Sequence, residues 1–215
     1  MHKAYWLGSV LLVLLSMGAS AAEVALVTAA SGNVKLQEEK AAASELKPFI
    51  KVREGDRLLM EGASRLQVVY FEGGRQETWS GRGALEVGSV SSKAIKGTMQ
   101  PEIKTLPAIL VKQLAKTPAQ DGNVKTGMIR MRSMPPYDRL ETVEKNYDEM
   151  RKQAVAGDLN PELYLLASYF ELREFDKLEA LLRQLNEKAS ETQELAALNM
   201  LYARAIRDAK STAKQ

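Results

Sequence analysis

Two closely spaced pairs of carboxylates are the side chains of this chain best suited to acid–base chemistry. Glu54 and Asp56 flank a glycine, and Glu72 and Glu77 flank a pair of glycines. A carboxylate pair can hydrolyse a glycosidic bond when one group protonates the leaving oxygen and the other attacks the sugar or activates water. Nothing in the sequence places either pair about a water or a sugar apart, so we interpret them as turn residues and a solvated hairpin edge. A carboxylate-based cell-wall glycan enzyme is therefore the less favoured alternative.

The chain lacks the side chains on which many other catalytic and metal sites depend. It contains no cysteine and a single histidine, His2, which lies in the segment that we expect to be removed. The remaining chain would then offer neither imidazole nor thiol, which excludes the usual zinc sites, Ser-His-Asp triads and Cys-His pairs. We expect no catalytic residues, no cofactor and no metal.

The composition is that of a globular chain with nearly balanced charge. Hydrophobic residues make up 45% and charged residues 27% of the 215 residues, proportions typical of folded domains. Lys and Arg number 30 and Asp and Glu number 27, which leaves a formal net charge of +3. Proteins that bind nucleic acid carry a marked excess of basic residues, so we expect no nucleic-acid partner.

The first 22 residues have the three parts of a secretory signal peptide. His2 and Lys3 form the basic start, residues 5–15 form the apolar run, and Ala19-Ser20-Ala21 fits the small-x-small cleavage pattern. The apolar run is shorter than the roughly 20 residues needed to span a bilayer, so we expect cleavage after Ala21 or Ala22. Because no later segment is apolar enough to span, we expect no membrane span after cleavage.

Residues 24–90 have the pattern of short β-strands. Apolar and β-branched runs are bounded by Gly, Asp and Ser, as turns between strands require. Seven strands are predicted, at residues 24–28, 33–36, 49–52, 57–60, 66–71, 76–79 and 84–87. Strands of this length and spacing favour a β-sandwich or a rolled-up barrel. Residues 37–47 interrupt the rhythm and predict a helical or flexible insertion.

The clearest local unit is a hairpin formed by residues 66–71 and 75–79. Gly73-Gly74 lies between the two runs, and paired glycines supply the positive φ that tight hairpin turns need. Alternation places Leu66, Val68 and Tyr70 on one face of the first strand and Val69 and Phe71 on the other. A strand that is apolar on both faces is expected to lie in the centre of the sheet.

Residues 96–136 predict a partly ordered linker, because prolines interrupt every longer apolar run. Residues 137–209 predict four helices with apolar stripes at three-four spacing. Asp138 and Asn160 are the expected N-caps of the first two helices, Pro161 is the first helical residue of the second, and Gly157 ends the first. The second helix, residues 160–172, is apolar on nearly all sides and is expected to be the buried one. Residues 210–215 predict a frayed tail.

Residues 24–90 resemble the FecR-type domain, the periplasmic module of iron-citrate-type signal transducers. The resemblance depends on Gly32-Asn33-Val34, on the Gly55-Asp56 turn, on Gly62-Ala63-Ser64 and on Phe71-Glu72-Gly73-Gly74. It implies a β domain that binds another protein or an envelope ligand, and a periplasmic location. A full transducer has a cytoplasmic segment and a membrane span, which this chain does not show, so relay of a signal across the membrane is not expected.

Residues 160–206 resemble a tetratricopeptide-type helical hairpin and its successor. Such repeats place small residues where the two helices meet, whereas the best register of this chain places Leu166 and Leu178 there. The chain holds at most one and a half repeats, fewer than the three or so that usually form a stable array. A plain antiparallel helix bundle is the alternative, and either arrangement can present a face to a partner.

Five side chains form the predicted interaction surface. Trp79, Tyr70 and Arg82 would make a ligand or peptide platform if Trp79 were exposed, although we favour its burial in the β core. Tyr164 and Tyr169 lie on the helix expected to meet a partner.

Together these patterns predict an α+β chain of two domains. The expected units are a signal peptide at 1–22, a FecR-like β-sandwich or roll at 23–95, a linker at 96–136, a bundle of TPR-like hairpins at 137–209 and a tail at 210–215. The predicted function is that of a non-catalytic periplasmic binding or scaffolding protein, in which the β domain docks to an envelope component and the helices hold a protein partner. A ligand-sensing accessory of an envelope signalling system is the alternative, with peptidoglycan or a small ligand as the contact.

Overall fold

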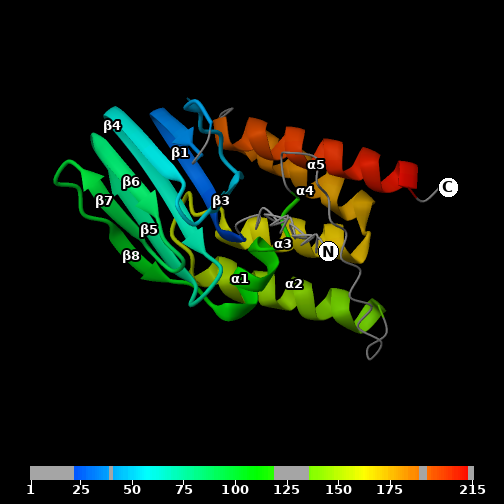
Figure 1. Ribbon diagram of the computed structural model, residues 1–215. Coiled ribbons are helices and arrows are strands. Elements are labelled where there is room, and N and C mark those ends of the chain that lie inside the picture. Colours follow the sequence, from blue (N-terminus) through cyan, green and yellow to red (C-terminus); the bar gives the residue numbers. More distant parts are fainter. Residues whose placement is uncertain (1–21, 39–40, 119–135, 189–192, 213–215) are drawn as a thin grey trace, which may run out of the picture.

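A β-sheet and a layer of helices pack side by side in the computed structural model (Figure 1), which describes residues 22–38, 41–118, 136–188 and 193–212. The strands precede the helices along the chain, so the predicted α+β class is confirmed. The strands are β1 (Glu23–Gln37), β2 (Ser44–Glu45), β3 (Lys51–Arg53), β4 (Arg57–Tyr70), β5 (Arg75–Ser80), β6 (Gly83–Val87), β7 (Ser92–Lys96) and β8 (Glu102–Thr105). The helices are α1 (Ala108–Leu114), α2 (Pro136–Gln153), α3 (Asn160–Leu172), α4 (Phe175–Lys188) and α5 (Gln193–Thr212).

The sheet is an antiparallel meander of four long rows. The first half of β4 pairs with β6 and its second half with β5, so β5 and β6 lie end to end along β4. In the same way β7 pairs with β6 and β8 pairs with β5, which makes β7 and β8 the two parts of the outermost row. On the opposite side of β4 lies β1, whose far edge carries the short strands β2 and β3.

Two of the predicted strand breaks are bends within longer strands. Residues 24–28 and 33–36 both belong to β1, and residues 57–60 and 66–70 both belong to β4. The register between β1 and β4 shifts where Gly32 faces Ser64. The cause is a bulge formed by Gly62-Ala63-Ser64, which does not reverse the chain. Each of the four rows carries a positive-φ glycine at this level, namely Gly32, Gly62, Gly81 and Gly97.

We predict that Gly32→Ala lowers the free energy of unfolding by about 2–4 kcal/mol. Gly32 has φ +80, and a Cβ there would lie 2.7 Å from Ser64 Oγ, whose hydroxyl donates a hydrogen bond of 3.1 Å to the Asn33 carbonyl. Urea denaturation measures the loss. Gly55→Ala is the matched control, because Gly55 has φ +90 but open space around its Cβ position. Equal losses in the two variants would show that the contact with Ser64 contributes nothing.

The bend folds the sheet over a core of its own. Side chains from both halves of β1 and β4 meet there, together with Trp79, Leu85 and Val87. Polar groups join the two halves at the rim, since the Tyr70 hydroxyl lies 2.7 Å from Ser92 Oγ. The alternation predicted for β4 is confirmed: Leu66, Val68 and Tyr70 belong to this inner core.

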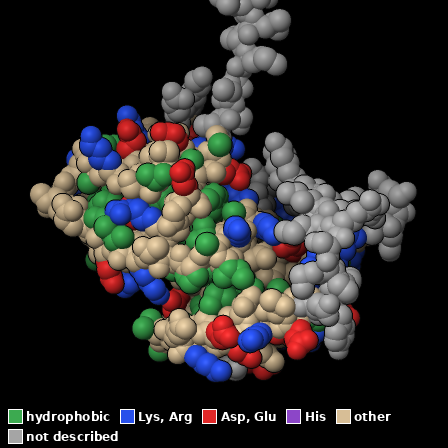
Figure 2. All heavy atoms as spheres, turned by 90° about the horizontal axis from the view of Figure 1, so that it is seen from below, with side chains coloured by type: hydrophobic (Ala, Val, Ile, Leu, Met, Phe, Trp, Pro, Cys, Tyr) green, Lys and Arg blue, Asp and Glu red, His purple; other side chains and the backbone are tan. Residues whose placement is uncertain are grey.

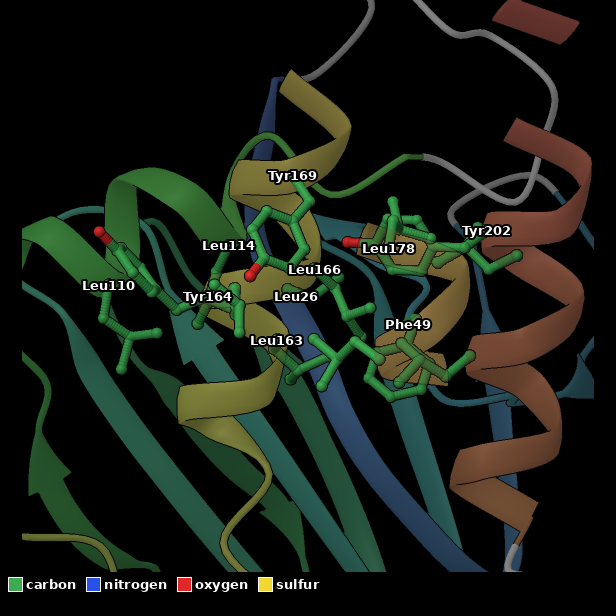
Figure 3. Close-up of a cluster of buried hydrophobic side chains, with 14 of the residues drawn as sticks. Leu26, Phe49, Leu110, Leu114, Leu163, Tyr164, Leu166, Tyr169, Leu178 and Tyr202 are labelled. Carbon is green, nitrogen blue, oxygen red and sulfur yellow. The ribbon is translucent and has the colours of Figure 1, made fainter. Parts of the chain in front are cut away.

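The other face of the sheet packs against the helices. Val69 of β4 and Leu26 of β1 contact a second core that contains Leu163 and Leu166 of α3 and Leu178 of α4 (Figure 3). This explains why β4 is apolar on both faces and why it lies in the centre of the sheet. The predicted hairpin of β4 and β5 is also present, with residues 71–74 as its loop and positive φ at both glycines.

The predicted buried helix is confirmed, but its expected cap is not. Residues 160–172 form α3, and ten of its residues from Asn160 to Tyr169 are buried. Leu159, not Asn160, occupies the N-cap position. The Asn160 side chain instead donates a hydrogen bond of 2.9 Å to Gln76 Oε1 of β5, in a buried contact between helix and sheet.

Several other segments differ from their predicted form. Residues 96–118 of the expected linker contain β8 and α1, whose Leu110, Val111 and Leu114 are buried in the core shared with α3. Ser44 and Glu45 pair with β1 instead of forming part of a helical insertion. The expected tail continues α5 to Thr212. Helix α2 ends at Gln153, although Gly157 does have positive φ. Residues 1–21 of the expected signal peptide and residues 119–135 of the expected linker lie outside the described residues.

Candidate functional site

Four of the five residues of the predicted interaction surface are buried. The exposed fraction is 0% for Tyr70, 2% for Trp79, 1% for Tyr164 and 7% for Tyr169, and only Arg82 is exposed. The favoured burial of Trp79 is therefore confirmed, whereas the predicted surface is wrong. Tyr70 and Trp79 fill the inner β core, and Tyr164 and Tyr169 fill the core between sheet and helices, because each lies on a face that another layer covers.

Glu77 is the centre of a buried polar network in the folded sheet. Its side chain has no exposed surface. Glu77 Oε1 accepts a hydrogen bond of 2.6 Å from Arg75 Nε, and Oε2 accepts bonds of 3.0 Å from Trp79 Nε1 and 3.1 Å from the backbone N–H of Ser92. Both oxygens are thus occupied, and burial raises the pKa of the neighbouring Tyr70 hydroxyl. The network joins β5 to β7, so we assign it to the stability of the bend.

The sequence did contain a signal for this network. Arg75, Glu77 and Trp79 alternate along one strand and therefore share a face, with the carboxylate between a cation and an indole N–H. We interpreted the strand as a solvated edge because its residues are polar. Because Glu77 is fully buried while Glu72 is exposed in the hairpin loop, these two carboxylates do not form a solvent-facing pair.

Asp56 belongs to the turn between β3 and β4. Its Oδ2 accepts a hydrogen bond of 2.7 Å from the Arg53 backbone N–H, while Glu54 is exposed in the same turn. Burial raises the pKa of the Asp56 carboxyl above its usual value of 3.8, although the bond from Arg53 opposes this shift. The geometry is that of a turn cap.

We predict that Asp56→Asn has a free energy of unfolding at pH 7 that equals that of the unmodified chain or exceeds it by up to about 1 kcal/mol. A carboxyl whose pKa is raised in the folded state stabilises the fold while it is protonated. This contribution is complete below pH 3.8 and is lost as the pH rises through the folded-state pKa. Asparagine keeps an acceptor for Arg53 without the charge. The unmodified chain should therefore gain stability relative to the variant as the pH falls towards 3.8 in urea titrations. Asp56→Ala, which removes the acceptor, should be less stable at every pH, and a variant gap that does not change with pH would contradict the prediction.

Two carboxylates among the helices also accept hydrogen bonds from neighbouring side chains. Glu162 of α3, 8% exposed, accepts a hydrogen bond of 3.0 Å from Arg151 Nη1 of α2. Glu144 of α2 accepts bonds of 2.8 Å from Lys177 Nζ and 3.0 Å from the Tyr169 hydroxyl, and the Lys177 ammonium holds the pKa of Glu144 below its usual value. These contacts join α2, α3 and α4, so we assign both carboxylates to the packing of the helices.

A mainly apolar groove is present in the described part of the chain. It has a volume of about 270 Å³ and lies between α5 and the segment that follows β2. Its lining is mainly apolar, and its basic side chains are those of Lys47 and Arg204. The residues that line it are Lys47, Pro48, Gln193, Ala196, Ala197, Met200, Leu201 and Arg204.

The spacing of the α5 residues explains how the groove forms. Positions 193, 196, 197, 200, 201 and 204 follow the three-four pattern of one helix face. Leu195, Leu198, Tyr202 and Ile206 form another stripe of α5 and are all buried, and the last three belong to the core between sheet and helices. The groove face is therefore a second apolar face of α5, and Met200 on it is 72% exposed. The sequence gives no separate signal for this face, because residues at the same three-four spacing form both stripes of α5.

Another face of the molecule shows mixed charge. On the face that carries α1 and α2, basic and acidic side chains are interspersed with small apolar patches (Figure 2). The described residues contain no group of three or more acidic, His or Cys side chains that could hold a metal ion, and no helix among them is long and apolar enough to cross a bilayer. Comparisons with protein-family models, with curated proteins and with solved structures found no match to this chain.

Proposed function

We propose that this chain is a non-catalytic binding protein of the periplasm, and that the α5 groove is the site at which an envelope protein docks. The observation that carries the proposal is the groove itself: a mainly apolar hollow between α5 and residues 47–48, with Met200 exposed in it. A mainly apolar groove along a helix can receive the apolar side chains of a partner segment. The signal-like first 22 residues support the periplasmic location.

The lining of the groove indicates the chemistry of the partner. Ala196 and Ala197 have small side chains, so a partner backbone can approach α5 closely, and Met200 adapts its shape to different apolar side chains. Lys47 supplies positive charge beside the groove, where a carboxylate of the partner would be attracted. We therefore propose that an apolar segment of a protein, flanked by an acidic residue, binds along α5 in the manner of a helix or strand in a groove.

The finer parts of the fold prediction belong to this proposal. A FecR-like bent sheet and TPR-like helix pairs are both modules that bind proteins, and the successive contacts of α2 with α3 and of α4 with α5 support the helix-pair arrangement. In this arrangement the sheet supports the helices from one side, while α5, the last helix, offers its outer face to the partner.

The test is photo-crosslinking in living cells with a photoreactive residue at position 200, followed by mass spectrometry of the adducts. Val155 is the matched control position, because it is an apolar residue with a similar exposed fraction, 70% against 72% for Met200, and does not line the groove. We expect one reproducible protein adduct from position 200 that is absent from position 155. Ala197→Glu should suppress the adduct, because it adds bulk and negative charge to the groove.

Two results would contradict the proposal. The first is the same set of adducts from both positions, which indicates nonspecific proximity. The second is no protein adduct from position 200 together with a ligand-dependent rise in melting temperature on addition of peptidoglycan fragments, which would favour a small-ligand sensor.

A further inference from the structure

In the outermost row of the sheet, β7 and β8 each pair with one strand and have one open edge among the described residues. In the described structure β8 pairs only with β5, and all four of its residues are exposed (Figure 1). Ile103 in its centre has an exposed fraction of 51%. An exposed strand edge can add a further strand through backbone hydrogen bonds, so β8 can serve as a pairing site.

The register shows which backbone groups of β8 face outwards. Leu106 N–H donates a hydrogen bond of 2.8 Å to the carbonyl of Gly74, and the same register places Lys104 opposite Gln76 and Glu102 opposite Thr78. In an antiparallel ladder hydrogen-bonded positions alternate, so Lys104 and Glu102 bond to β5. The N–H and C=O groups of Ile103 and Thr105 therefore point away from the sheet.

The sequence of β8 is complementary to itself in the antiparallel direction. If two copies pair about Ile103, each Glu102 lies opposite the partner copy's lysine at 104, and the two isoleucines lie opposite each other. Opposite charges and apolar residues at facing positions both favour strand pairing. Ile103 N–H would bond to its counterpart's carbonyl, and Thr105 N–H would bond to the carbonyl of the opposite residue 101.

Both charged side chains of β8 are able to take part. Glu102 is exposed, and Lys104 keeps 52% of its side chain exposed although its Nζ lies 3.3 Å from Asp158. Pro101 and Pro107 flank the strand and lack an N–H, so the ladder cannot extend far and the register around Ile103 is the one that uses most bonds.

We propose that β8 pairs with β8 of a second copy of this chain, antiparallel and two-fold symmetric about Ile103. The contact is small, so the dimer is expected to be weak and to exchange with the monomer. This inference is independent of the α5 groove, which lies on another element.

The charges of β8 allow a sharp test by sedimentation velocity on the full chain. The unmodified chain should show concentration-dependent dimers, measured from about 10 µM to about 1 mM. Glu102→Lys places lysine opposite Lys104 and Lys104→Glu places glutamate opposite Glu102, so each variant alone should dimerise at least about tenfold more weakly. An equimolar mixture of the two variants should restore the dimer, because opposite charges then face each other at both positions.

A cysteine reports the register directly, because the chain has no cysteine of its own. Cα atoms of a hydrogen-bonded antiparallel pair lie about 5.5 Å apart, within the range of a disulfide. Ile103→Cys should therefore form a disulfide-linked dimer under mild oxidation. Ile95→Cys is the matched control, since Ile95 of β7 is 44% exposed on the other part of the same row, and it should stay monomeric.

Three outcomes would overturn the proposal. One is an unmodified chain that stays monomeric at every concentration. Another is a dimer that neither charge variant weakens, or an equimolar mixture of the two variants that does not dimerise more strongly than each variant alone. The third is equal or faster crosslinking of Ile95→Cys. Circular dichroism of each variant at the same concentration establishes that the fold is intact, so that loss of pairing is not loss of structure.

Discussion

Glu77→Ala is expected to lower the free energy of unfolding by about 2–4 kcal/mol, because it removes a fully buried carboxylate from its network of hydrogen bonds. The change leaves Trp79 Nε1 and the Ser92 N–H without an acceptor and the Arg75 guanidinium without its carboxylate. Urea denaturation followed by Trp79 fluorescence measures the loss. Trp79 is the only tryptophan after residue 22, so in the chain that remains after the expected cleavage its fluorescence reports the β core alone.

Two further variants separate the network from its charge. Glu72→Ala, an exposed carboxylate in the adjacent loop, should change stability by less than about 0.5 kcal/mol. Glu77→Gln keeps an acceptor for one N–H but leaves Arg75 without its carboxylate, so it should fall between the unmodified chain and Glu77→Ala. A Glu77→Ala variant within about 1 kcal/mol of the unmodified chain would mean that the network does not hold the two halves of the sheet together.

Leu166→Ala should destabilise the sheet and the helices together, by about 3–5 kcal/mol. Leu166 of α3 is fully buried in the core that also contains Leu26 of β1 and Val69 of β4 (Figure 3). The cavity left by the truncation therefore lies between the two layers. Circular dichroism at 222 nm follows the helices and Trp79 fluorescence follows the sheet, and the two curves should shift by the same amount and remain coincident.

This measurement also tests the predicted division into a β domain and a helical domain. If the layers were independent domains, the helical signal alone would move and the fluorescence transition would stay where it was. Met200→Ala is the control, because a side chain that is 72% exposed leaves no cavity and should cost less than about 0.5 kcal/mol. Separate transitions in the unmodified chain would contradict the shared core.

The sequence alone determined the features that depend on residues close together in the chain. The alternation of β4 identified both of its faces, the glycines at 73 and 74 identified the hairpin loop, and the apolar composition of residues 160–172 identified α3 as the buried helix. These signals are local, because the side chains of a strand alternate every two residues and those of a helix recur about every 3.6. Turn glycines are equally local, because φ is a property of a single residue.

Only the tertiary structure decided where polar and aromatic side chains ended up. Glu77 reads as solvated in its strand, and it becomes buried because the bend at Gly32 and Ser64 brings β7 over it. Tyr164 and Tyr169 have the same apolar spacing whether a partner protein or the chain's own sheet covers them. Their burial depends on which layer packs against α3.

The two proposed contact surfaces have the same origin. Nothing local distinguishes the stripe of α5 that meets the core from the stripe that lines the groove with Lys47, since both follow helical spacing. Nor does the sequence of β8 reveal that its outer edge lacks a neighbour. Whether a face or an edge is covered depends on residues far away in the chain. The periodicity of a sequence indicates whether a segment is a helix or a strand, but it does not indicate which other segment packs against it.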